Sequence, residues 1–157
     1  MKILLLVIGK TDQPFLEEGM RLYFARIEHY IPFEFKVIPD LKNRKRLSEA
    51  EQKEAEAKVI ESQLQVGDVL VLLDENGKNY HSRGFATFLE QQMLQSVKRL
   101  VFVIGGPYGF TDKLRQQSRF LISLSPMTFS HQLVRLVFAE QLYRAFSIIK
   151  GEPYHHD

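Results

Sequence analysis

The chain has 157 residues, of which 45% are apolar, and a formal net charge of +2. This length suits one hydrophobic core, so we expect a single domain over residues 1–157 in which any basic surface is local. The chain has no cysteine and no apolar run near the roughly 18 residues of a membrane span, which excludes disulfides, thiolate metal sites and a membrane helix, and is compatible with a cytoplasmic location.

Apolar runs and helical apolar stripes alternate along the chain. Buried strands are predicted, in order, at Lys2–Ile8, Phe33–Ile38, Val69–Leu73, Leu100–Ile104 and Phe120–Leu124. Helices are predicted over residues 13–29, 49–64, 82–96, 113–118 and 132–149. This order is typical of an α/β fold, and we expect a parallel sheet with helices on both faces.

Polar residues mark where the helices begin and end. Candidate N-caps are Asp12, Ser48 with a capping box to Glu51, Ser82, and Thr111 or Asp112, and Gly151 is expected to end the last helix. The second helix has only a thin apolar seam, formed by Ala55, Val59, Ile60 and Leu64. We therefore expect the second helix to be the most exposed one.

The last helix carries more apolar residues than one stripe needs. They are Leu133, Val134, Leu136, Val137, Phe138 and Ala139. A sheet covers only one side of a helix, so the surplus predicts a subunit interface. A two-fold homodimer is the commonest solution.

Two unusual loops follow the last two strands. One contains Gly105, Gly106 and Gly109, where the backbone can approach a ligand closely, and the other is the hydroxyl-rich segment Ser125–Thr128. Loops at the carboxyl ends of parallel strands form a crevice where α/β sheets bind ligands. The glycine pattern is neither GxGxxG nor GxxxxGK[ST], so it does not identify the ligand.

The third strand is expected to end in a tight turn from Asp74 to Gly77, with Leu73 beside the ligand. Acidic residues in such turns more often hold the turn than act as a general base, so we expect a structural role for Asp74. The loop Asp40–Leu47 carries Lys42, Arg44, Lys45 and Arg46, the densest positive charge in the chain. Such a run is either solvated or in contact with RNA phosphates.

A few side chains could act chemically near neutral pH. They are His131, Tyr154, His155 and His156. Adjacent histidines seldom share one metal ion, and no HxxxH spacing is present, so we expect no metal. Ser125 and Ser130 lie in no GxSxG context, which disfavours a serine hydrolase.

Three C-terminal segments together are highly specific. VFVIGGPYG, SLSPMTFSH and AEQLYRAFSIIKGEPYHH resemble the signatures of the ribosomal large-subunit methyltransferase H family, SPOUT-class enzymes that methylate N3 of a pseudouridine in 23S rRNA. The segments IPFEFKVIP and LDENGK stand in corresponding places, so the resemblance spans the whole chain. It implies a C-terminal trefoil knot, S-adenosylmethionine as cofactor, a homodimer whose interface completes the site, and the ribosome as partner.

The resemblance also implies roles for particular residues. Cofactor contacts fall on Leu73, Gly105, Leu124, Ser125, Pro126, Met127, Thr128 and Phe129. Catalytic and substrate-positioning roles fall on His131, Arg144, Tyr154, His155 and His156. His156 stands where members often carry Lys or Arg, so a permanent positive charge becomes a conditional one.

Two alternatives remain at this point. The chain could be an RNA-binding or nucleotide-binding module without catalysis, or a SPOUT methyltransferase with a different RNA target. The small net charge suggests that recognition needs an assembled ribosomal surface rather than naked RNA.

Overall fold

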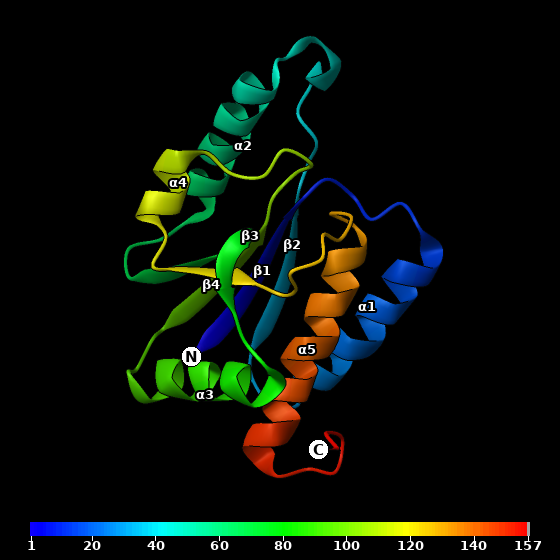
Figure 1. The fold of residues 1–157 in the computed structure, drawn as a ribbon, viewed down its shortest axis with the longest axis vertical. Coiled ribbons are helices and arrows are strands. Elements are labelled where there is room, and N and C mark those ends of the chain that lie inside the picture. Colours follow the sequence, from blue (N-terminus) through cyan, green and yellow to red (C-terminus); the bar gives the residue numbers. More distant parts are fainter. Residues whose placement is uncertain (157) are drawn as a thin grey trace.

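A parallel sheet forms the middle layer of the molecule (Figure 1). The computed structural model describes residues 1–156, in which the strand order is β2-β1-β4-β3-β5 with every neighbouring pair parallel. The strands are β1 Lys2–Ile8, β2 Phe33–Ile38, β3 Asp68–Asn79, β4 Arg99–Ile104 and β5 Phe120–Ser123. The α/β class and the parallel sheet are confirmed.

Helices cover both faces of the sheet. They are α1 Pro14–Ile27, the 3-10 turn η1 Arg44–Arg46, α2 Glu49–Gln63, α3 Ser82–Leu94, α4 Asp112–Gln117 and α5 Leu133–Lys150. Alternating side chains of β1 separate two cores, because Ile3, Leu5 and Val7 pack with α1, α3 and α5, whereas Leu4, Leu6 and Ile8 pack with α2 and α4. No helix within residues 1–156 has the length and apolar character needed to cross a membrane.

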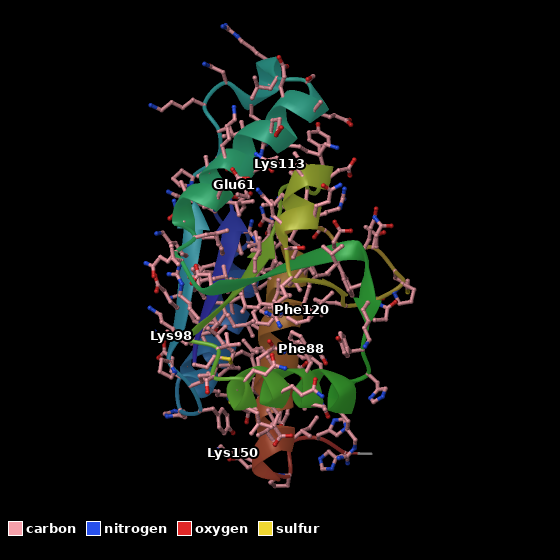
Figure 2. All side chains as sticks on the ribbon, turned by 90° about the vertical axis from the view of Figure 1, so that its left-hand side faces the viewer. Glu61, Phe88, Lys98, Lys113, Phe120 and Lys150 are labelled. Carbon is pink, nitrogen blue, oxygen red and sulfur yellow. The ribbon has the colours of Figure 1, made fainter. Side chains whose placement is uncertain are left out.

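Contacts between neighbouring elements can be followed in Figure 2. Lys113 of α4 lies 3.7 Å from Glu61 of α2, measured between Nζ and Oε1. On the other face, the ring of Phe88 in α3 meets the edge-strand residue Phe120 with ring centroids 5.0 Å apart. On one face α4 therefore contacts α2, and on the other α3 packs against β5.

The helix ends agree only in part with the sequence. The capping box is confirmed, since Glu51 N donates to Ser48 Oγ (3.2 Å) and Ser48 N donates to Glu51 Oε2 (2.7 Å). Thr111 caps α4, and Gly151 ends α5 at φ +68°. Asp12 and Ser82 were wrong as N-caps, because the cap positions are Gln13 and His81.

Asp12 and His81 each form a side-chain hydrogen bond near the start of a helix. Asp12 accepts a hydrogen bond from Gln132 Nε2 (2.6 Å), which links the start of α1 to the start of α5. His81 uses Nδ1 to accept from the backbone N–H of Gly84 (3.1 Å), so an imidazole does the work expected of a serine hydroxyl.

The expected seam of α2 was wrong in part. Of its four residues only Ile60 is buried, and the buried face also contains Ala57 and two polar residues, Gln52 and Glu56. Polar residues can occupy a buried face when they bond each other, and Gln52 Nε2 donates to Glu56 Oε1 (2.9 Å). Counting apolar residues alone misses this arrangement.

The expected turn after Leu73 was also wrong, since β3 continues to Asn79 through an irregularity. Leu73 and Lys78 both pair with Ile122 of β5. A Cβ on Gly77 would lie 2.5 Å from Ile122 N, so only glycine allows the two backbones to approach this closely. Figure 1 shows this green segment crossing in front of β5.

Much of the surplus apolar surface of α5 is covered within the subunit. Helix α5 packs against both α1 and α3. Phe138 and Ala139 are fully buried, and the Phe138 ring lies 4.8 Å from that of Phe102 in β4. These two residues belong to the core and were wrong as interface residues, whereas Leu133 is exposed and Val137 is partly exposed.

A buried arginine joins β1 to α5. Arg135 is fully buried and donates to the carbonyl oxygens of Ile8 (2.5 Å), Gly9 (2.9 Å) and His131 (3.1 Å) and to Thr11 Oγ1 (3.0 Å). The guanidinium thus satisfies backbone acceptors at the end of the first strand and the start of the last helix. The sequence pattern does not predict this role, because the partners of Arg135 at the end of β1 lie 126 and 127 residues away along the chain.

Replacing Arg135 by Met should lower the free energy of unfolding by about 3 kcal/mol, because two buried and two partly buried acceptors lose their donor. Urea denaturation followed by circular dichroism measures this change. The matched control is Arg21→Met on α1, whose side chain is 73% exposed and should change stability little. Equal effects of the two substitutions would contradict a structural role for Arg135.

Candidate active site

A pocket of about 420 Å³ lies beyond the ends of β4 and β5, beside the bend in β3. This volume is in the range of small-molecule sites. Three chain segments form most of the wall: Leu73–Glu75, residues 104–110, and residues 122–131 with the exception of Pro126. The crevice expected from the sequence is therefore present.

The structure brings most of the expected cofactor residues together. Those that line the pocket are Leu73, Gly105, Leu124, Ser125, Met127, Thr128 and Phe129, and His131 lies in the same wall. Pro126 does not line it. Ser125 Oγ accepts a hydrogen bond from Met127 N (2.9 Å), so Pro126 sits at the tip of a turn that the serine closes.

Hydroxyl groups hold the loop after β5 in place. Ser123 Oγ donates to Ser125 O (3.0 Å), and Ser130 Oγ accepts from Leu133 N at the start of α5 (3.1 Å). Asn79 Nδ2 donates to Ser123 O (3.1 Å), which ties the extended β3 to the same loop. These side chains satisfy backbone groups and shape the pocket before a ligand arrives.

The glycines of the other loop are needed for different reasons. Gly109 has φ +73°, a conformation that favours glycine. A Cβ on Gly105 would lie 3.0 Å from the Phe110 ring, and one on Gly106 would lie 2.6 Å from Glu56 Oε1. Close approach of neighbouring side chains therefore already requires Gly105 and Gly106, in addition to any approach of a ligand.

A fixed ion pair lies in the pocket wall. Asp74 accepts hydrogen bonds from Arg115 Nε (2.8 Å) and from Asn76 N (2.9 Å), and its side chain is 3% exposed. The carboxylate holds the bend in β3, which agrees with the structural role expected for it. Arg115 was not predicted from the sequence, because its partner is 41 residues away along the chain.

His131, in the pocket wall, is the predicted catalytic residue of the pocket. Burial lowers the pKa of His131 below its usual value, and the positive charges of Arg135 and Arg44 lower it further. Because the ordinary histidine pKa is about 6.5, the imidazole is neutral at physiological pH. A neutral ring can accept a hydrogen bond.

A second cluster lies between the middle of α5 and the tail that follows it. Glu140 Oε1 accepts hydrogen bonds from Arg144 Nε (3.0 Å) and from Tyr154 OH (3.0 Å). Arg144 Nη1 lies 3.4 Å from His155 Nδ1, and its guanidinium carbon lies 4.8 Å from the centre of the Tyr154 ring. Arg144, Tyr154 and His155 are therefore brought together, with Glu140 as the residue that sequence reasoning missed.

Aromatic packing orders the tail. The Tyr154 ring meets Tyr143 edge-on with centroids 4.6 Å apart, and its hydroxyl lies 3.4 Å from that of Tyr23 in α1. Burial raises the pKa of Tyr154, and the bond to Tyr23 and the charge of Glu140 raise it further, so the phenol stays protonated at physiological pH. His156 is exposed.

The two clusters do not meet within one chain. They lie at different heights along α5, because Glu140 and Arg144 follow Leu133 by 7 and 11 residues, which is about 10 to 16 Å along the helix axis at 1.5 Å per residue. Figure 1 shows the pocket loops near the first turns of α5 and the red tail at its other end. No group of three or more metal-ligating side chains suited to holding an ion occurs in the described part of the chain.

Comparison with known proteins places these features in a family context. Residues 1–155 match the family model described as predicted SPOUT methyltransferase. Proteins named ribosomal RNA large subunit methyltransferase H are similar to this chain, with 57% identity in Parabacteroides distasonis (all of both chains) and 54% in Christiangramia forsetii (99% of each). A probable methylase family protein from Haemophilus influenzae has a similar fold, with TM-score 0.56 and 11% identity over 95% of this chain and 66% of that one.

Substituting Gly105 by Val should abolish measurable binding of S-adenosylmethionine, because a branched side chain would enter the pocket wall and displace the Phe110 ring. Isothermal titration calorimetry measures the affinity, and circular dichroism checks that the protein is folded. Gly84→Val is the matched control, since Gly84 has no positive φ and a Cβ there would make only ordinary contacts, the nearest at 3.4 Å to the His81 ring. A folded Gly105→Val protein with wild-type affinity would refute the assignment of the pocket.

Proposed function

This chain belongs to the SPOUT methyltransferase family, and from that premise we propose that it transfers a methyl group from S-adenosylmethionine to large-subunit ribosomal RNA. The observation that carries the proposal is the pocket, which is lined by seven of the eight residues expected to contact the cofactor. The finer proposal, which follows the family resemblance, is methylation of N3 of a pseudouridine in 23S rRNA on assembled ribosomes in the cytoplasm.

The pocket suits S-adenosylmethionine by its chemistry. Leu73, Ile104 and Leu124 offer an apolar wall for a flat base, and the turn at Ser125–Thr128 offers backbone and hydroxyl groups for polar atoms. Bound S-adenosylmethionine supplies an electrophilic methyl group on a sulfonium. The residues of the chain then have to hold the acceptor in line with that methyl group and exclude water.

The tail cluster suits the RNA substrate. The Tyr154 ring offers a stacking surface for an unpaired base, and Arg144 supplies a permanent positive charge next to it. Methylation at a ring nitrogen requires loss of its proton, and a fixed cation stabilises the anion that forms. Glu140 orients both Arg144 and Tyr154, so we propose that it prepares the cluster for the base.

A homodimer would bring the two clusters together. The pocket and the tail lie at opposite ends of α5, so we propose that the tail of one protomer completes the pocket of its partner. Exposed apolar residues support this arrangement: Phe15 and Leu22 on α1 are 64% and 50% exposed, and Leu133 on α5 is 39% exposed. Helices α1 and α5 lie side by side, so these residues belong to neighbouring elements.

We further propose that the C-terminal part of the chain is threaded as the trefoil knot that the family resemblance implies. The support is the crossing at Gly77, where β3 passes directly over β5 before α3 begins. This crossing brings Leu73 and Asn79, on either side of the irregularity, next to the pocket loop.

The basic loop is a candidate contact for the RNA backbone. Lys42, Lys45 and Arg46 are exposed and form no ion pair with any residue of the described chain, whereas Arg44 pairs with Asp40 (3.0 Å). The charge of Arg44 also acts on His131, which places this loop on the pocket side of the molecule. Phosphate contacts there would add affinity without sequence specificity.

Deleting residues 154–157 tests the proposed function and the role of the tail. Asp157 lies outside the described residues, and the deletion removes Tyr154 and His155 but none of the residues that line the pocket. We expect methylation to fall by about 100-fold or more, because positioning of the acceptor is lost, with a much smaller change in S-adenosylmethionine affinity. The assay uses labelled cofactor, ribosomes from cells lacking the enzyme, and nucleoside mass analysis.

The outcomes of that assay separate the alternatives. Cofactor binding without methylation by the wild-type protein would favour a binding module, and a methylated nucleoside other than N3-methylpseudouridine would indicate a different RNA target. Full activity of the truncated protein would refute the role of the tail.

A further inference from the structure

A buried carboxylate lies directly behind the glycine loop and outside the pocket. Glu56, in α2, is 4% exposed, and it accepts a hydrogen bond from Gln52, which is 2% exposed. Its oxygens lie against Gly106, where a Cβ would be 2.6 Å from Oε1 and 2.7 Å from Oε2. Gly106 lines the pocket and Glu56 does not, so the carboxylate touches the loop from the far side.

Stability does not explain a carboxylate at this position. No Lys or Arg forms an ion pair with Glu56 in the chain as far as residue 156. Burial raises the pKa of Glu56, although the Gln52 amide, the Gly106 backbone and the charge of Arg44 act in the opposite direction and Asp40 acts in the same direction. An apolar residue of similar size would avoid the cost of burying this charge.

The contact does explain why residue 106 is glycine. The positive-φ glycines of the described chain are Gly9, Gly67, Gly109 and Gly151, so the backbone of Gly106 is open to any residue. The space for a side chain there is taken by Glu56. The position of the loop at Gly106 is therefore set by the carboxylate behind it.

We propose that Glu56 is a positioning residue that holds Gly106, and with it the glycine loop, in the conformation that binds S-adenosylmethionine. Helix α2, the polar helix on the far side of the loop, would thereby help to position the cofactor-binding loop. The proposal rests on the proposed function only in taking S-adenosylmethionine as the ligand.

The test compares Glu56→Gln with Glu54→Gln, an exposed position on the same helix. Calorimetric titration with S-adenosylmethionine should show a Kd raised about tenfold for Glu56→Gln and unchanged for Glu54→Gln. The melting temperature of Glu56→Gln at pH 8 should stay the same or rise, because a buried charge has been removed, and kcat at saturating cofactor should stay within about twofold. A purely structural residue would give the opposite split, with a lower melting temperature and an unchanged Kd.

A double-mutant cycle tests the contact itself. Gly106→Ala alone should weaken binding strongly, because the new methyl group meets the carboxylate, whereas Gly106→Ala combined with Glu56→Ala should bind more tightly than Gly106→Ala alone. Additive effects, or a wild-type Kd for Glu56→Gln, would overturn the inference. If the wild-type protein binds no S-adenosylmethionine in the same titration, the proposed function fails and this inference fails with it.

Discussion

The bonds of the buried Arg135 guanidinium are the constraint on which the site depends. They join the end of β1 to the start of α5, and one of them fixes the carbonyl oxygen of His131. The loop after β5 leads into this point, where Ser130 Oγ accepts a hydrogen bond from Leu133 N in the first turn of α5. The pocket wall from residue 122 to 131 is therefore held at both ends, by the sheet and by the buried arginine.

The same helix that the arginine anchors also separates the two halves of the proposed site. Its first turn borders the pocket, its C-terminal half carries Arg144, and the tail follows it. Rigid packing of α5 against α1 and α3 keeps these halves apart within one subunit. In the proposed dimer, catalysis would then depend on the partner subunit, because the pocket and the tail cluster of one subunit do not contact each other.

Features that depend on residues close together in the sequence were predicted correctly. Continuous apolar runs located every strand of the described chain, the capping box at Ser48 was found from spacing alone, and the two loops of the crevice were placed correctly. It failed where a contact joins distant residues. Arg115 with Asp74, Arg135 with β1, and Glu56 with Gly106 each pair a polar residue with a partner that only the folded chain supplies.

The most direct test of the shared site uses mixed dimers. Two differently tagged chains, one carrying Gly105→Val and the other lacking residues 154–157, are co-expressed, and the mixed dimer is isolated by sequential affinity steps. If the pocket of one protomer works with the tail of its partner, one of the two sites is intact and the mixed dimer should show roughly half of the wild-type kcat. Activity no higher than that of either variant alone would contradict a site built from two subunits.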